Sequence, residues 1–173
     1  MKKDFMISYL LIVFIFTALI LSGCEQKKDE QTSGNSKIAG TYMLEYRELP
    51  NGTKVYPPDI NGMSTFTKTY RSLIVTWKDS VGESITLASI TEYELKEDTY
   101  TEKNIFFMAS VPGSTGPLYD FSNNSETETI TRSNGKFSFL LPLNRTPQVT
   151  ITFGTTGWVA RGPGFADYWE IIE

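Results

Sequence analysis

The chain of 173 residues contains one cysteine, Cys24, and no histidine. Cys24 ends the tetrapeptide LSGC, which follows an apolar run and precedes the polar stretch EQKKDEQ. Without histidine the chain lacks the usual general base, a Ser-His-acid triad and imidazole ligands for a metal. A single cysteine also cannot form a disulfide within the chain. We therefore expect a fold stabilised by burial and strand pairing, with no metal and no cofactor.

Acidic side chains are the remaining candidates for catalysis. They form three close pairs in the sequence, Glu92/Glu94, Glu97/Asp98 and Glu126/Glu128. Two carboxylates about 5–9 Å apart across a cleft could hydrolyse a glycosidic bond. Alternating acids on a strand are more simply explained as solvated charges on its polar face. We therefore expect no enzymatic activity.

Arg71 is the strongest candidate for binding a ligand. It shares strand parity with Leu73, Val75 and Trp77, so it would lie on their face, near the start of that strand. At the mouth of a barrel it could pair with the carboxylate or phosphate head of an amphipathic ligand whose tail lies along aromatic rings. The candidate ligand-binding residues are Arg71, Tyr42, Tyr46, Trp77, Tyr93 and Trp169. In the alternative interpretation, Arg71 is solvated beyond the end of the barrel and the aromatic side chains simply fill the core.

The elements that would position these side chains are β-strands, because apolar residues alternate with period two in short runs over residues 38–173. Residues 40–49 predict Tyr42, Leu44 and Tyr46 inside and Thr41, Glu45 and Arg47 outside. Other expected inward pairs and triplets are Leu73/Val75/Trp77, Ile85/Leu87, Tyr93/Leu95, Phe137/Phe139 and Val149/Ile151/Phe153. In residues 100–109 either Ile105/Phe107 or Phe106/Met108 could face inward.

Turn residues separate these runs. The predicted turns are Asn51-Gly52, residues 79–82, Glu97-Asp98 and Ser133-Asn134-Gly135, and Asn-Gly is the strongest hairpin signal among them. Residues 50–63, with Pro57-Pro58, are expected to form a loop or a short helix across one end. About eight short strands joined by hairpins indicate a sandwich or a closed antiparallel barrel. The many large aromatic side chains on one face favour the barrel.

The amino-terminal segment has the order of a secretion signal, because Lys2 and Lys3 precede an apolar run and small residues. It resembles a bacterial lipoprotein signal. That resemblance implies that residues 1–23 are removed, that a diacylglycerol is joined to the Cys24 sulfur, and that the new amino group is acylated, for example with palmitate. Two or three acyl chains hold a protein stably on a membrane. The alternatives are an uncleaved transmembrane anchor, for which the apolar run is barely long enough, and a buried structural thiol.

Residues 24–37 would be a flexible tether, because residues 25–37 contain no aliphatic or aromatic side chain. Without residues 1–23, Lys+Arg falls from 16 to 14 and Asp+Glu from 20 to 19, so the formal charge changes from −4 to −5. A mildly acidic domain is a poor candidate for binding nucleic acid. The expected location is outside the cytoplasm, anchored by lipid to a bacterial cell membrane.

Residues 38–67, IAGTYMLEYRELPNGTKVYPPDINGMSTFT, resemble the opening of bacterial lipocalin-like domains. FADYWEIIE, at residues 165–173, resembles their final strand. The resemblance implies an all-β fold, an antiparallel up-and-down barrel of about eight to ten strands over residues 38–173. It also implies the binding of a small hydrophobic or amphipathic molecule. The alternative is a solid barrel that docks protein partners through residues 57–62 and 111–118.

Overall fold

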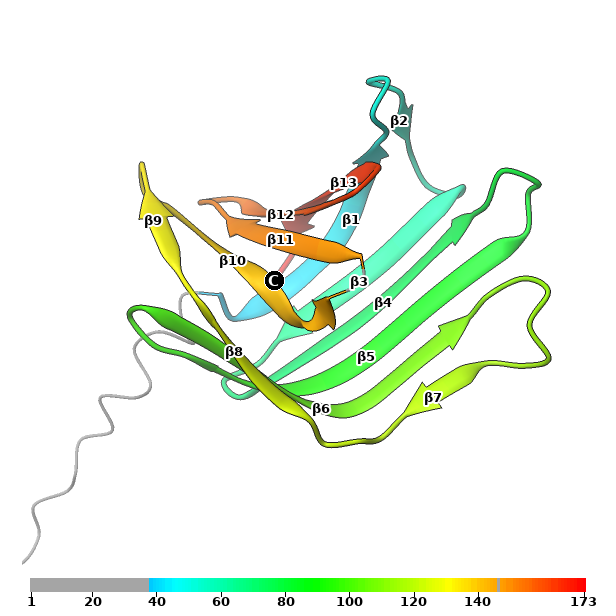
Figure 1. Ribbon diagram of the computed structural model, residues 1–173. Coiled ribbons are helices and arrows are strands. Elements are labelled where there is room, and N and C mark those ends of the chain that lie inside the picture. Colours follow the sequence, from blue (N-terminus) through cyan, green and yellow to red (C-terminus); the bar gives the residue numbers. More distant parts are fainter. Residues whose placement is uncertain (1–37, 146) are drawn as a thin grey trace, which may run out of the picture. The chain divides into compact units, whose positions relative to one another are not determined.

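The structure is a computed structural model that describes residues 38–145 and 147–173. The expected signal segment, Cys24 and the tether lie outside these residues. The described part of the chain is all β: it contains thirteen strands and no helix (Figure 1). Accordingly, no helix in this part could cross a membrane.

The strands form one antiparallel sheet. In chain order they are β1 (Gly40–Glu48), β2 (Lys54–Val55), β3 (Ile60–Phe66), β4 (Tyr70–Lys78), β5 (Ser84–Leu95), β6 (Thr99–Ser110), β7 (Leu118–Asp120), β8 (Ser125–Thr129), β9 (Thr131–Ser133), β10 (Lys136–Arg145), β11 (Gln148–Phe153), β12 (Gly157–Gly162) and β13 (Phe165–Ile171). Their order in the sheet is β7-β6-β5-β4-β3-β1-β13-β12-β11-β10-β9, with β2 beside β1 and β8 beside β6. Most strands that are adjacent in the sheet are also consecutive in the sequence. The pairing of β1 with β13 brings the first and last strands together.

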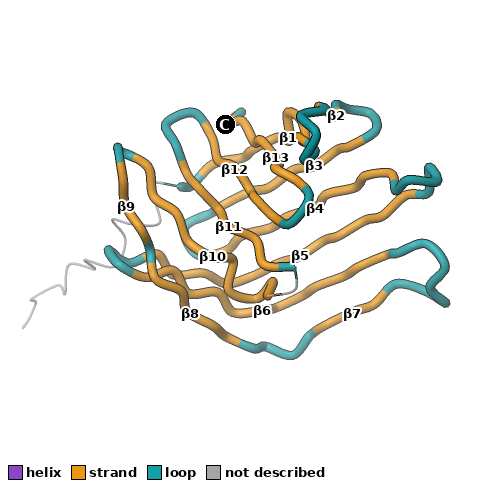
Figure 2. Tube along the Cα trace, turned by 45° about the horizontal axis from the view of Figure 1, so that its top comes forward, coloured by secondary structure: helices purple, strands orange, loops and turns teal. Residues whose placement is uncertain are grey.

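The sheet curls until its two ends approach each other (Figure 2). β8 pairs with β6, whereas β9 pairs with β10, and only Ile130 separates β8 from β9. The stretch from β8 to β9 therefore pairs with β6 on one side of the curled sheet through its first half, and with β10 on the other side through its second half. This arrangement confirms an all-β, antiparallel, barrel-like fold. The thirteen strands exceed the expected eight to ten, because β2, β7 and β9 are only two or three residues long.

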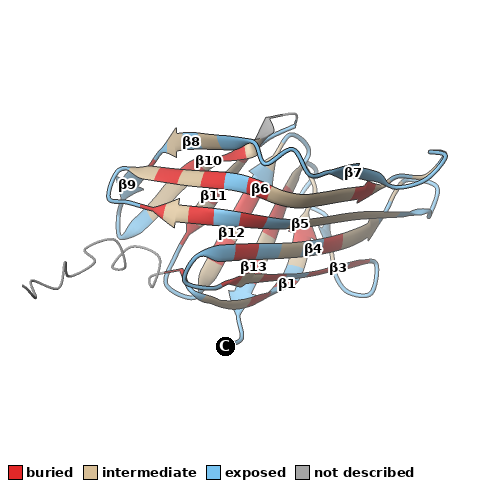
Figure 3. Cartoon of the chain, turned by 90° about the horizontal axis from the view of Figure 1, so that it is seen from below, coloured by how far each residue is buried: buried red, intermediate tan, exposed pale blue. Residues whose placement is uncertain are grey.

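The inner face of the sheet carries a packed aromatic core, visible as the alternation of buried and exposed positions along the strands (Figure 3). Tyr42 meets Phe66, Phe153 and Trp158 edge-on, with ring centroids 5.9–6.3 Å apart. Trp158 stacks on Trp169 at 4.6 Å with an angle of 5° between the rings. The predicted inward positions Leu44, Val75, Tyr93, Leu95, Phe139, Val149, Ile151 and Phe153 are all buried. The period-two pattern was therefore a good guide to the core.

Two β-bulges change the predicted side-chain directions. A register shift between Leu44 and Tyr46 on β1 leaves Glu45 as the extra residue. Because one extra residue reverses the parity of the residues after it, Arg47 is buried, and Tyr46 is only half-buried, stacked on Tyr168 at 4.4 Å. The prediction of Tyr46 inside and Arg47 outside is therefore wrong.

A second bulge lies where β5 pairs with β6, between the partner pairs Ile90/Phe106 and Thr91/Asn104. Ile105 is the extra residue. Phe107 then lines the interior and Ala109 is buried, whereas Phe106 contacts Tyr119 and Phe121. Of the two alternatives for residues 100–109, the one with Phe107 facing inward therefore holds beyond the bulge, and the one with Phe106 facing inward does not.

The segment after β1 also differs from expectation. Residues 50–63 contain no helix; β2 pairs with the end of β1, and β3 already begins at Ile60. The predicted hairpin at Asn134-Gly135 is confirmed, because it joins β9 to β10 with φ angles of 51° and 74° at these two residues. Positive φ at both central positions matches the twist of the flanking strands.

Gly157 lies where β12 begins, and any larger residue would collide with the neighbouring backbone. A Cβ atom there would overlap the carbonyl oxygen of Trp169. We expect Gly157→Ala to lower the free energy of unfolding by about 2–3 kcal/mol, measured by urea denaturation. Gly154→Ala is the matched control, since its Cβ would approach only the Gly157 oxygen, at 3.7 Å. Equal unfolding midpoints for the two variants would contradict this account.

Candidate ligand-binding cavity

A cavity of about 310 Å³ lies on the inner side of the sheet. One wall is formed by side chains of β4, β5 and β6, namely Arg71, Ser89, Thr91, Asn104 and Phe107. The rest of the lining comes from β7, β8, the segment between them and β10, through Asp120, Ser122, Asn124, Glu126 and Leu143. A cavity of this size can hold one small molecule.

The cavity lies where β6 changes its partner. β8 pairs with Thr99–Lys103, and β7 pairs with Phe107–Ala109. Between these two ladders the segment from β7 to β8 passes β6 without forming a strand. Asn104 attaches it there: its backbone N–H donates to the Asn124 carbonyl at 2.8 Å and its Nδ2 donates to the Asp120 carbonyl at 3.2 Å. Ser122 and Asn124 of this segment line the cavity.

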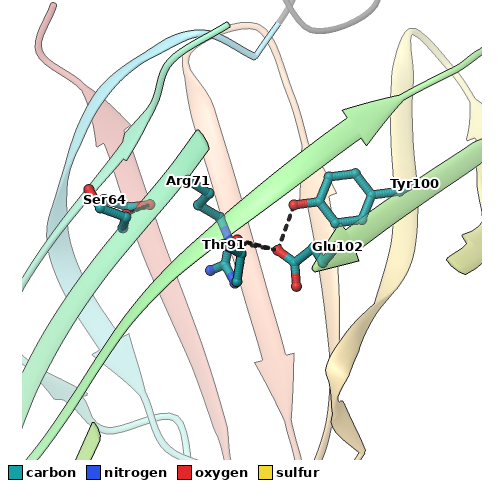
Figure 4. A network of polar contacts seen from close by, with 6 residues as sticks. Ser64, Arg71, Thr91, Tyr100 and Glu102 are labelled. Atoms are coloured by element: carbon teal, nitrogen blue, oxygen red, sulfur yellow. Dashed lines mark hydrogen bonds and ion pairs between the residues drawn. The ribbon is translucent and has the colours of Figure 1, made fainter. Parts of the chain in front are cut away.

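Arg71 enters the cavity wall as one half of a buried ion pair (Figure 4). Its side chain extends from β4 across β5 to Glu102 on β6, and Nε donates to Glu102 Oε1 at 2.7 Å. The same oxygen accepts from the Tyr100 hydroxyl at 2.7 Å and from Thr91 Oγ1 at 3.4 Å. Arg71 is 4% exposed and Glu102 is fully buried.

The electrostatic environment keeps Arg71 charged. Burial works against the cation, but the attraction of Glu102, the nearby Tyr100 hydroxyl and the hydrogen bonds to them hold the pKa of Arg71 above its usual value. Burial, together with the Glu102 charge, raises the pKa of Tyr100 well above its usual value. The guanidinium of Arg71, which can only donate hydrogen bonds, thus retains its charge on a residue that lines the cavity.

The cavity lining is mainly polar and contains few ionisable groups. Ser89, Thr91, Asn104, Ser122 and Asn124 offer hydroxyl and amide groups, and Phe107 and Leu143 offer apolar surface. The remaining charged side chains besides Arg71 are two acids, Asp120 and Glu126. Since Glu102 already neutralises Arg71, an anionic ligand would meet no excess of positive charge. The chemistry of the lining fits a neutral molecule with several hydrogen-bonding groups and a small apolar part.

Of the six residues predicted to bind a ligand, only Arg71 lines this cavity. Tyr42, Tyr93 and Trp169 belong to the packed core. Trp77 packs against that core and lies 4.7 Å from the Arg47 guanidinium. Tyr46 is half-buried beside Tyr168. Because Arg71 is buried, the alternative in which it is solvated beyond the barrel is wrong.

Of the six residues in the predicted acid pairs, only Glu126 lines the cavity. Glu97 and Asp98 are exposed in the β5–β6 turn, and Glu92 is exposed on β5. Glu126 lines the cavity, and its cross-strand partner on β6 is Glu102. Glu102 forms the ion pair with Arg71. No group of three or more histidine, cysteine or acidic side chains in the described part of the chain is arranged to hold a metal.

Two buried polar residues of β6, Glu102 and Asn104, were not predicted from the sequence. Both follow Tyr100 at intervals of two, and all three are buried. Their shared parity with an aromatic residue was the available signal that these polar side chains face inward. Which arginine would meet Glu102 depends on the register of β4, β5 and β6, and the sequence does not show that register.

A second buried ion pair connects β1 and β13, the first and last strands of the described chain. Arg47 on β1 donates from Nε and Nη2 to the two carboxylate oxygens of Asp167 on β13, at 2.6 and 2.8 Å. Its guanidinium lies between the rings of Trp77 and Phe165, at 4.7 and 4.6 Å. Neither Arg47 nor Asp167 lines the cavity, so we assign this pair a structural role.

No family model, curated protein or solved structure matches this chain. The function therefore has to be argued from the cavity and from the sequence.

Glu102→Gln would keep the shape of the side chain but remove its charge, leaving Arg71 as a buried cation without a counter-charge. We expect the free energy of unfolding to fall by about 3–5 kcal/mol in urea denaturation. Combining it with Arg71→Met removes both charges and should recover part of that loss.

The control for this experiment is the exposed pair Lys78–Asp59, whose side chains are 51% and 61% exposed. Asp59→Asn should change the free energy of unfolding by less than about 1 kcal/mol. The interpretation fails if the double variant is no more stable than Glu102→Gln alone.

Proposed function

We propose that this chain is an exported lipoprotein, anchored at Cys24, whose barrel-like domain binds a small amphipathic molecule in the cavity beside Arg71. The observation that carries the proposal is the cavity of about 310 Å³ with a buried, charged arginine in its wall. Burying a charged side chain is costly even when it is paired. An arginine kept charged in the cavity wall is best explained by an occupant that accepts hydrogen bonds.

The polar part of the occupant is expected to be neutral. Arg71 brings no net charge because Glu102 compensates it, and the Asp120 carboxylate would repel an anion. Hydroxyl groups can both donate and accept, so they could serve the arginine, the amides and the acids together. A polyol or sugar-like head meets these requirements better than the carboxylate or phosphate head expected from Arg71 alone.

The apolar part of the occupant is expected to be short. Phe107 and Leu143 supply apolar surface to the cavity. The aromatic residues that were expected to contact a long tail, Tyr42, Tyr93 and Trp169, instead pack against other core side chains. Only a short chain or a small ring would therefore fit beside the polar head.

Export and lipid attachment are supported by the signal-like order of residues 1–23 and by the lone Cys24 at its end. A flexible tether as long as residues 25–37 has a root-mean-square span of about 20 Å. It would hold the cavity within a few nanometres of the membrane surface. Such a position suits a module that receives or retains a molecule close to a bilayer.

Ligand binding can be tested with three probes that share an octyl tail: octyl glucoside, octanoate and octylammonium, each below its micelle-forming concentration. Isothermal titration calorimetry should show the tightest binding for the neutral glucoside, at least about tenfold tighter than for octanoate. Ser89→Phe, which fills the cavity, should abolish binding.

Ser84→Phe is the matched control, because Ser84 is exposed on the same strand. It should bind octyl glucoside as the parent chain does. Failure of all three probes to bind, or unchanged binding by Ser89→Phe, would refute a ligand role for this cavity.

Lipid attachment can be tested in cells fed an alkyne analogue of palmitate. The parent chain should be labelled and recovered in the membrane fraction, with a mass that corresponds to cleavage before Cys24 and addition of acyl chains. Cys24→Ser should lose the label. A full-length, unmodified polypeptide in the parent strain would rule out the anchor while leaving the cavity test intact.

A further inference from the structure

A continuous row of apolar side chains crosses the outer face of the sheet. The strand register places Met43, Met63, Ile74, Ala88, Met108 and Tyr119 directly beside one another on six neighbouring strands, from β1 to β7. We call these six residues the outer row. Met43, Met63, Ile74 and Tyr119 are 39–59% exposed. Extended apolar surface of this kind on a soluble domain usually marks an interaction site.

The rows on both sides of the outer row are uncharged. On one side lie Thr41, Thr65, Ser72, Ile90 and Phe106, which are also direct cross-strand neighbours. Phe106 joins Tyr119 and Phe121 in an aromatic cluster at the β7 end, where Phe121 is 62% exposed.

On the other side of the outer row lie Asn61, Thr76, Thr86 and Ser110. The three rows together contain no acidic or basic side chain, although 21% of the chain is charged. Solvated strand faces normally carry charges that keep a protein apart from its neighbours. Their absence over three rows indicates a face that is covered.

We propose that this face binds a second copy of the same chain. The chain carries a formal charge of −4, so two copies repel each other except where they meet without charges. A face with no acid or base offers nothing to an oppositely charged protein. A bilayer surface would call for basic side chains at the headgroups, and these rows have none. An identical neutral face is the partner that this surface complements.

A two-fold axis gives such a pair a specific register. With the axis parallel to the strands, in the plane between the two faces and midway between Ile74 and Ala88, the outer row of one copy lies along the reversed outer row of the other. Met43 then meets Tyr119 of the second copy, and Met63 meets Met108. Contacts of methionine sulfur with aromatic rings are favourable, and an exposed aromatic cluster is a suitable anchor for an interface.

The size of the face is sufficient for a pair of modest stability. Five strand spacings of about 4.8 Å and three rows about 7 Å apart give about 24 by 14 Å between backbone positions. Including the side chains, each copy would bury roughly 600 Å², or roughly 1,200 Å² in total, at the lower end of specific interfaces.

The test uses the full chain with Cys24→Ser, so that an introduced cysteine is the sole thiol. Packed sheets lie about 10 Å apart, beyond the reach of a disulfide, so a short bis-maleimide replaces direct oxidation. Ile74→Cys, near the proposed axis, should yield a product of twice the mass on a denaturing gel. The matched control is Leu118→Cys on β7, where Leu118 is 66% exposed. In the proposed pair its two copies lie at opposite ends of the interface, so it should cross-link at least tenfold less.

Adding Met63→Lys to the Ile74→Cys chain places a charge in the interface and should reduce the cross-linked product at least tenfold. Light scattering of the purified Cys24→Ser chain should give twice the mass of one chain. The same chain with Met63→Lys should give the mass of one chain. The proposal is overturned by equal cross-linking of Ile74→Cys and Leu118→Cys. It is equally overturned by an adduct of another mass, or by a single-chain mass for the parent. Circular dichroism confirms that each variant is folded.

Discussion

An open antiparallel sheet has unpaired backbone N–H and C=O groups on its two edge strands, and these groups need hydrogen-bond partners. In this domain the stretch from β8 to β9 supplies partners on both sides, because β8 pairs with β6 and β9 pairs with β10. To reach that position the chain has to leave β6 after β7 and return to it as β8. The segment between them forms no strand and is attached to β6 by the two hydrogen bonds of Asn104. The cavity lies beside this segment.

The interior is divided between a solid part and a hollow part. Around Tyr42, Phe66, Phe153 and Trp158 the aromatic rings meet edge-on or tilted and fill the space. Beside Arg71 the side chains are short and polar, and they leave room. A buried ion pair is weak support for stability, since apolar residues of similar volume often serve as well. Its position at the wall of the hollow part is the basis of the proposed ligand binding.

Alternation and turn chemistry predicted the all-β class, most inward positions and the Asn134-Gly135 hairpin, because these depend on local backbone preferences. The errors have one physical cause. Each bulge, at Glu45 and at Ile105, adds a residue and reverses parity, and neither is marked by a glycine or proline at that place. Arg47, Tyr46 and Phe107 were misplaced or undecided for this reason. The pairing of Arg71 with Glu102 depends on the register of three strands, so only one partner could be found from the sequence.

The pairing of β1 with β13 has a consequence for how the chain folds. Arg47 and Asp167, which join these strands, are 120 residues apart in the sequence. Contacts of such long range cost loop entropy before they bring any gain, and they slow folding. A chain made from its amino end cannot complete the cylinder until its last strand has emerged. Until then the edge of β1 that pairs with β13 has no partner.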